Sequence, residues 1–286
     1  MYKILEKDVL ANNVVKMVID APFIARKVRP GQFVVLRTSE TGERFPLTVA
    51  AKDPDKGTIT IIFAQVGKST CALGQFSAGD SILDVVGPLG AATHFDPNIK
   101  KAAVIGGGLG CAIALPEAQH LHDVGVSVDV IAGFRTKDII ILEDEMRGAS
   151  ENLYIATDDG SFGFHGLVTD VLKNQIESGV QYDLVIAIGP LIMMKFVSKL
   201  TKEYGIPTIV SMNPIMIDGT GMCGCCRLLV DGQVKFACID GPDFDGHKVD
   251  FDTSIRRLGM YDKLTKQDDS CNLLKQADAQ KEKEAQ

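Results

Sequence analysis

Tryptophan is absent from this chain of 286 residues, and aromatic residues together make up only 6% of it. No dense cluster of Lys and Arg occurs either, and the formal net charge is -7. A protein that binds nucleic acid usually carries a basic face and aromatic platforms on which bases stack. The composition therefore argues against a nucleic-acid partner.

Long apolar runs are also missing. No stretch approaches the roughly 20 apolar residues that a helix needs to cross a bilayer. Residues 1–6 enter a strand-like pattern at once and do not resemble a signal peptide. The chain is long enough, and at 45% hydrophobic residues apolar enough, for two ordinary domains. These features predict a cytoplasmic protein without a membrane partner.

Cysteine is sparse but clustered: four of the seven cysteines lie within sixteen residues, from Cys223 to Cys238. Without a secretion signal, disulfides do not explain such a cluster. The spacing Asp218-x4-Cys223-x2-Cys226-x11-Cys238 can surround one compact inorganic centre, because the x2 step takes two sulfurs from one glycine-rich turn. Soft thiolates suit iron and sulfide. The sequence therefore predicts a 2Fe-2S cluster with these four residues as ligands.

Zinc is the competing interpretation of the same cysteines. Structural zinc commonly uses two Cys-x2-Cys knuckles, or one knuckle with histidines. Here there is one knuckle, and the nearest histidine, His247, lies nine residues beyond Cys238. The fourth ligand is open between Asp218 and Cys225. A carboxylate ligand at Asp218 would favour the ferric state and lower the potential.

The first part of the chain, residues 1–97, has the pattern of an antiparallel β-barrel. Strand-like runs at 13–19, 32–37 and 58–63 are separated by turn signals rich in Gly, Pro and Asp. No long helical period lies between them.

Residues 98–210 have a different pattern. An apolar run at 101–105 leads into five residues with four glycines and then an Ala-rich helix. Similar short apolar runs recur further along, with helical stretches between them, and this predicts a parallel sheet covered on both faces. We therefore predict the fold class β-barrel plus α/β.

The remaining chain is predicted to form a small iron–sulfur appendage, residues 211–250, and a C-terminal helix and tail, residues 251–286. The appendage includes a hairpin whose turn is Asp231-Gly232. After about residue 265 the tail has too little apolar surface for a core, which suggests a frayed or partner-bound helix.

Three stretches have the chemistry of nucleotide sites. A glycine turn between strand and helix, as in residues 106–110, lets the backbone approach a pyrophosphate, although such a turn can also simply pack a helix. Arg135 stands at the end of the second strand, where an acidic residue often holds a ribose. It could contact a phosphate or belong to a solvated loop. In the first part of the chain, residues 44–48 and 66–70 offer a cation, hydroxyls and backbone amides suited to a phosphate, and either stretch alone also fits a simple turn.

In this order the parts resemble the ferredoxin-NADP reductase superfamily in its iron–sulfur form, over residues 1 to about 250. Within it, the cluster residues are similar to those of the small (alpha) subunits of NADH-dependent reduced ferredoxin:NADP oxidoreductases, in which an aspartate replaces the first cysteine. Electron-transfer subunits of dihydroorotate dehydrogenase use four cysteines instead. The resemblance implies that FAD contacts Arg44, Pro46, Leu47, Thr48, Ile62, Phe63, Ala64, Gly67, Ser69 and Thr70. The implied NAD(P) contacts are Gly106, Gly107, Gly108, Leu109, Gly110, Asp158, Gly189 and Pro190. We add Arg135 to this predicted site because of its position at the end of the second strand.

Three redox sites in one chain predict a relay. A nicotinamide moves two electrons together, an iron–sulfur cluster moves one, and a flavin can do both. The resemblance also implies a heterodimer with a larger flavin and iron–sulfur subunit that couples NAD(H), NADPH and ferredoxin by flavin-based bifurcation. Two alternatives remain: the electron-transfer subunit of an NAD-dependent dihydroorotate dehydrogenase, and a zinc-stabilised scaffold that is not an enzyme.

Overall fold

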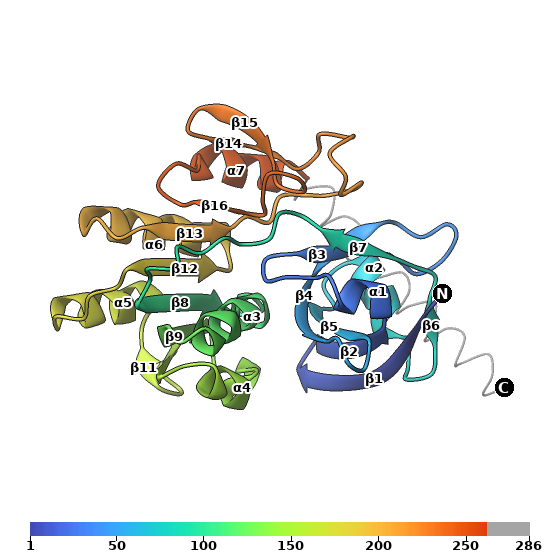
Figure 1. Ribbon diagram of the computed structural model, residues 1–286, viewed down its shortest axis with the longest axis horizontal. Coiled ribbons are helices and arrows are strands. Elements are labelled where there is room, and N and C mark those ends of the chain that lie inside the picture. The colour runs from blue at the N-terminus through green and yellow to red at the C-terminus, as the bar shows by residue number, and fades with distance from the viewer. Residues whose placement is uncertain (262–286) are drawn as a thin grey trace.

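Two seven-stranded sheets lie side by side in the computed structural model, which describes residues 1–261 (Figure 1). The tail that the sequence predicts after about residue 265 lies outside the described residues. Among residues 1–261, no helix has both the length and the apolar character needed to cross a membrane.

The first sheet is a nearly closed antiparallel barrel with the strand order β6-β1-β2-β5-β4-β3-β7. The terminal strands of this order, β6 and β7, are consecutive in the chain, so one segment pairs with β1 and then with β3 and brings the two edges of the sheet together. The strands are β1 (Tyr2–Ala11), β2 (Val14–Asp20), β3 (Phe33–Arg37), β4 (Phe45–Asp53), β5 (Thr58–Ala64), β6 (Ser81–Ile82) and β7 (Asp84–Leu89). Two short helices, α1 (Pro22–Ala25) and α2 (Lys68–Gly74), accompany them. The predicted barrel is confirmed.

The second sheet has the order β11-β10-β9-β8-β12-β13-β16 and is parallel except for β16. Its strands are β8 (Lys101–Gly107), β9 (Ser127–Phe134), β10 (Asn152–Thr157), β11 (Phe164–His165), β12 (Leu184–Ile188), β13 (Thr208–Ser211) and β16 (Asp243–Asp245). The helices are α3 (Gly110–Asp123), η1 (Lys137–Ile139), α4 (Glu143–Gly148), α5 (Val168–Glu177) and α6 (Leu191–Glu203).

Alternate residues of β8 point into two different cores, as its unbroken apolar run predicts. Val104 packs in a core with Leu121 of α3. Ile105 packs in a second core with Leu172 of α5 and Met194 of α6. The sheet is therefore covered on both faces, which confirms the predicted α/β part.

The cluster segment, residues 211–250, contains the hairpin strands β14 (Arg227–Val230) and β15 (Gln233–Phe236). Asp231 and Gly232 have φ values of 52° and 71°, the left-handed pair of a type I′ turn, so the predicted hairpin is confirmed. The segment is joined to the α/β sheet, because its strand β16 pairs with β13. Helices α7 (Phe251–Leu258) and η2 (Gly259–Tyr261) follow.

The cluster segment also packs on the outer face of the barrel. Val34 and Leu36 of β3 point into the barrel core. Phe33 and Val35, on the opposite face, share a core with Cys226 and Cys238. In Figure 1 the hairpin and α7 lie above the α/β sheet, and the loop before β14 extends toward β3 and β7. The barrel and the metal-ligand candidates are therefore neighbours.

Candidate functional site

The sulfur atoms of Cys226 and Cys238 lie 3.2 Å apart. This is well beyond the roughly 2.05 Å of a disulfide bond, and both cysteines are free and buried. The hairpin causes the approach, because Arg227 pairs with Phe236 and the two cysteines flank that pair. Burial, followed by the neighbouring Cys226 thiol, raises the pKa of Cys238 to about 12. Two thiols are thus held side by side, in the arrangement that two ligands of one iron need.

The other two predicted ligands, Asp218 and Cys223, lie on the glycine-rich loop before the hairpin, which we call the cluster loop. The Asp218 carboxylate accepts hydrogen bonds from the Thr220 hydroxyl at 2.5 Å and from the amides of Thr220 and Met222 at 2.9 and 3.2 Å. These bonds, the Thr220 hydroxyl first, hold its pKa below the usual range. Cys223 is exposed, and its sulfur accepts a bond from the Cys225 amide at 3.5 Å.

Asp218 and Cys223 lie close to the paired cysteines, since the backbone of Gly221 between them hydrogen-bonds the Cys238 sulfur. Among residues 1–261, however, no three Cys, His, Asp or Glu side chains are already gathered as metal ligands. The structure brings Cys226 and Cys238 together and leaves the other two on the adjoining loop. Three thiols and one carboxylate in this setting fit an iron–sulfur cluster.

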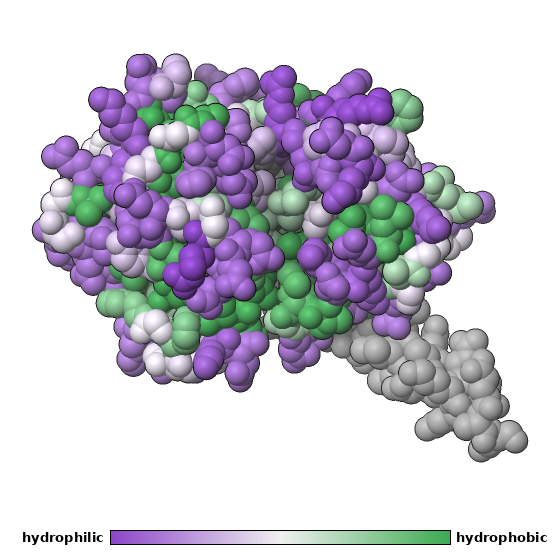
Figure 2. Space-filling model, turned by 60° about the horizontal axis from the view of Figure 1, so that its bottom comes forward, coloured by the Kyte–Doolittle hydropathy of each residue, from purple (hydrophilic) through white to green (hydrophobic). Residues whose placement is uncertain are grey.

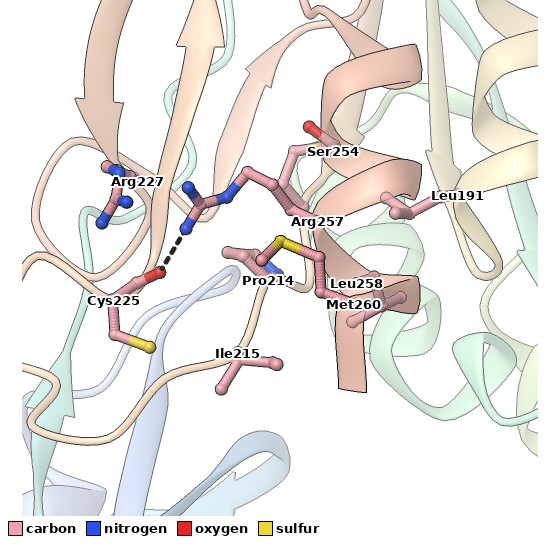
Figure 3. Close-up of a pocket in the computed structure, with 10 residues that line it drawn as sticks. Leu191, Pro214, Ile215, Cys225, Arg227, Ser254, Arg257, Leu258 and Met260 are labelled. Carbon is pink, nitrogen blue, oxygen red and sulfur yellow. Dashed lines mark hydrogen bonds between the residues drawn. The ribbon is translucent and has the colours of Figure 1, made fainter. Parts of the chain in front are cut away.

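Cys225, the rival for the fourth position, faces another part of the surface. It lines a pocket of about 160 Å³ together with Arg227 and Arg257, and Arg257 donates a hydrogen bond to its carbonyl at 3.3 Å (Figure 3). The remaining lining residues come from the start of the cluster segment and from helices α6, α7 and η2: Leu191, Met212, Pro214, Ile215, Ser254, Leu258 and Met260. None of the four predicted ligands lines this pocket.

The predicted flavin contacts of residues 44–48, which we call the flavin strip, begin at Arg44 and continue along β4. Pro46 pairs with Val35, and Thr48 pairs with Phe33. Because paired residues share a face of a sheet, Pro46 and Thr48 lie on the outer face that the cluster segment covers. Arg44 is close enough to Asp218 for its charge to lower the pKa of that carboxyl. The strip therefore adjoins the cluster loop.

Two predicted flavin contacts have side chains directed elsewhere. Leu47 and Phe63 pack with the barrel core, and Phe63 is only 1% exposed. Their contact with a flavin would have to come from the backbone. Ile62, one residue earlier, packs in the core that contains α3, so it faces the α/β part. Ala64 ends the same strand.

Residues 66–70, which the sequence predicts as a phosphate site, span the turn before α2 and the first residues of that helix. The Thr70 hydroxyl oxygen accepts hydrogen bonds from the amides of Gly67 and Val66 at 3.1 and 3.2 Å. The Ser69 hydroxyl donates to Glu43 at 2.7 Å. Glu43 was not among the predicted residues, although its position directly before Arg44 is a usable signal. The Glu43 carboxylate thus binds a hydroxyl that the sequence predicts as a phosphate contact.

The predicted dinucleotide turn lies at the carboxyl end of β8, beside the end of β12. A β-carbon at Gly110 would fall 2.3 Å from the carbonyl oxygen of Ile188, and one at Gly189 would fall 3.1 Å from Cα of Gly107. The strand order reverses between β8 and β12, which is where open α/β sheets bind their ligands. Gly106, Gly108 and Leu109 complete the turn, and Pro190 caps α6.

Arg135 and Asp158 lie at the same edge of the sheet. The Asp158 amide donates to the Phe134 carbonyl at 3.0 Å, and the next amide, of Asp159, donates to the Arg135 carbonyl at 3.3 Å. This edge faces the barrel (Figure 1). In Figure 2 apolar side chains gather where the two halves of the molecule meet, while the outer margins are mostly polar.

Known proteins match this architecture along nearly its whole length. The iron-sulfur cluster binding domain of dihydroorotate dehydrogenase B matches residues 213–250. A dihydroorotate dehydrogenase B (NAD(+)) electron transfer subunit homolog from Thermotoga maritima is 45% identical over 259 residues, 91% of each chain. The dihydroorotate dehydrogenase B (NAD(+)) electron transfer subunit of Geobacillus thermodenitrificans is 34% identical over 254 residues, 86% of this chain and 96% of that protein.

A solved structure of an NADH-dependent reduced ferredoxin-NADP oxidoreductase, studied for flavin-based electron bifurcation, is similar throughout. Its TM-score is 0.88 at 42% sequence identity, over 93% of this chain and 95% of that one. These matches confirm the predicted cofactors, FAD, NAD(P) and a 2Fe-2S cluster, and they set the zinc scaffold aside. The assignment of single residues to each cofactor remains a prediction.

Proposed function

Because the chain belongs to the family of dihydroorotate dehydrogenase B electron-transfer subunits, within the ferredoxin-NADP reductase superfamily, we propose a specific role for it. It is the small subunit of an electron-bifurcating ferredoxin:NADP oxidoreductase. In that role it passes electrons between NAD(H), FAD and its 2Fe-2S cluster.

The contact between the cluster loop and the flavin strip carries this proposal. Asp218 lies within the electrostatic reach of Arg44. The next residue, Gly219, lies against Val35 of β3, which pairs with Pro46 of the strip. A bound flavin supplies the conversion between two-electron exchange with a nicotinamide and one-electron exchange with a cluster. The cluster would then lie next to the flavin strip, on the outer face of the barrel.

The dinucleotide turn also adjoins the barrel. Helix α3 begins at Gly110, and its core also includes Ala50 of β4 and Ile62 of β5. The turn and the flavin strip are therefore positioned by one packed interface. This arrangement supports exchange between a nicotinamide and the flavin.

A larger partner subunit with its own flavin and iron–sulfur centres, and ferredoxin acting through the complex, complete the proposal. Cys223 is exposed on the cluster loop, with Met222 beside it 88% exposed. An exposed ligand loop bordered by apolar side chains suits docking of another redox protein. The isolated chain would then lack the second half of the reaction.

The decisive experiment uses the co-purified complex. Anaerobic addition of NADH, and then of NADPH, should reduce flavin and cluster in sequence, recorded by optical and electron paramagnetic resonance spectra. Full ferredoxin-dependent NADP reduction by this chain alone would contradict the proposed partner.

The second candidate is the electron-transfer subunit of an NAD-dependent dihydroorotate dehydrogenase. The names of the relatives and of the matching cluster domain favour it. Asp218, in place of a fourth cysteine, argues against it. If dihydroorotate, rather than reduced ferredoxin with NADPH, reduces the purified complex, this second function replaces the first.

A further inference from the structure

A buried carboxyl pair joins three parts of the molecule at one point. Thr93 lies in the connection that follows the barrel, Glu117 lies on α3, and Asp243 lies on β16 of the cluster segment. The Thr93 hydroxyl oxygen is 2.8 Å from Oε1 of Glu117 and also contacts Oδ2 of Asp243. Gly31 of the barrel closes the site, since a β-carbon there would fall 2.3 Å from the Thr93 hydroxyl.

The contact of one hydroxyl with two carboxyl groups requires an additional proton on one of the carboxyls. A threonine hydroxyl carries a single hydrogen, so it can donate to only one of two carboxylates. The other carboxyl can bond the same oxygen only by donating a hydrogen of its own. Glu117 is 1% exposed, and neither its Oε2 nor Oδ1 of Asp243 has a partner that could relieve a second negative charge.

Within residues 1–261, no cation forms an ion pair with either carboxyl. Neither Arg29 nor His94, the nearest basic residues along the two loops, reaches them. Asp243 is faced by the Ser211 and Thr93 hydroxyls. Burial, and then the Asp243 charge, raise the pKa of Glu117 to about 8.

We propose that one proton, shared by Glu117 and Asp243 through the Thr93 hydroxyl, stabilises the packing of α3 and β16 against the barrel. The three residues are positioning residues. They fix the helix that begins at the dinucleotide turn and the strand that ends the cluster segment relative to the flavin strip. The electron-transfer consequence rests on the proposed function, whereas the proton-dependent junction does not.

The direction of the pH effect follows from proton linkage. The pKa of Glu117 is about 8 in the folded chain and 4.5 in the ordinary, exposed state. Between pH 4.5 and about 8 the closed junction binds more protons than the opened one. The stability of the closed junction therefore falls as pH rises through this range and stays constant above about 8. The opening equilibrium should increase by up to about tenfold per pH unit in that window.

The test compares Glu117→Gln with the unmodified, cofactor-loaded protein between pH 6 and 9.5. Glutamine keeps a donor for Thr93 and cannot titrate. Hydrogen-exchange protection of β16 should fall with rising pH in the unmodified protein and stay level in the variant, with thermal midpoints following the same pattern. Glu145→Gln, an exposed glutamate on α4, is the matched control and should keep the original pH dependence.

Equal pH dependence of protection in the unmodified protein and Glu117→Gln overturns the proposal. If Glu117→Gln fails to fold, Asp243→Asn serves instead: it removes the Asp243 charge that adds to the raised pKa of Glu117, so the fall in protection should shift to lower pH, and an unchanged pH range overturns the proposal. The electron-transfer readout is the rate of cluster reduction by NADH, which should decline as pH rises toward 8 and stay constant above it in the unmodified protein, and should show no such decline in Glu117→Gln. The exchange measurement needs no turnover, so it remains decisive if the proposed function fails.

Discussion

Gly219 lies against Val35 at the contact between the cluster loop and the barrel. A β-carbon at position 219 would fall 2.9 Å from Cγ2 of Val35 and 3.1 Å from Cδ1 of Leu89, and the residue has a φ of +80°. Only glycine satisfies both the conformation and the approach. The residue next to Asp218 is thereby fixed on the outer face of the barrel.

Replacing this glycine should release the cluster loop. We expect Gly219→Ala to lower the free energy of unfolding by about 1 kcal/mol for the left-handed backbone and by about 1–3 kcal/mol more for overlap with the barrel. Iron content should fall with it. Gly232→Ala is the control, because it has a φ of +71° with nothing within 4 Å of the added β-carbon. Equal losses in the two variants, measured by denaturant unfolding, would show that the barrel contact contributes nothing.

Adjacent cysteines should differ in their importance for the cluster. Cys226 faces Cys238, whereas Cys225 lines the pocket beside Arg257. Cys226→Ser should reduce bound iron and sulfide to background after anaerobic reconstitution, because it removes one of two paired thiols. Cys225→Ser should retain both. Loss of iron in Cys225→Ser would instead make Cys225 the fourth ligand.

Asp218 should set the redox potential. A carboxylate ligand favours the ferric state, so Asp218→Cys is expected to raise the cluster potential measured by titration with electron paramagnetic resonance detection. Cys225→Ser serves as the control, since it changes a nearby sulfur without changing a predicted ligand. An unchanged or lower potential in Asp218→Cys would count against ligation by Asp218.

The dinucleotide turn tolerates no side chain at Gly110. An added β-carbon would meet the Ile188 carbonyl oxygen at 2.3 Å, a backbone atom that cannot rotate away. Gly110→Ala should cost about 1–3 kcal/mol of stability and weaken NADH binding on the order of tenfold. Gly148→Ala, another helical glycine, meets nothing within 4 Å and should be neutral or slightly stabilising. Unchanged NADH affinity in Gly110→Ala, by calorimetry, would remove the turn from the binding site.

Glu43 should weaken FAD binding, because its carboxylate holds the Ser69 hydroxyl beside the predicted diphosphate site. Removing one exposed charge has modest effects, so Glu43→Gln is expected to tighten FAD binding about two- to fivefold, and less at high salt. Glu40→Gln removes the same charge three residues away and should have a smaller effect. If the two variants bind FAD alike in fluorescence titrations, Ser69 does not contact the diphosphate.

Local signals accounted for much of the architecture. The unbroken apolar run at β8 required burial on both faces, and Asp231-Gly232 defined its hairpin through two left-handed residues. The Cys226 and Cys238 spacing likewise indicated a metal site, since the hairpin between them determines their separation. Glu43 and Glu117 were missed, because an acidic residue near a phosphate site or within an Ala-rich helix has no distinctive spacing.

The sequence by itself determined the types of the parts, their order and the cofactor chemistry, because each depends on residues close together in the chain. Tertiary structure decided the contacts between the parts. Thr93 meets Asp243 across 150 positions, Gly219 meets Val35, and Cys225 lines a pocket that neither Cys226 nor Cys238 lines. These relationships arise when whole sheets and helices pack, and packing selects which faces meet by shape and buried area rather than by any local pattern.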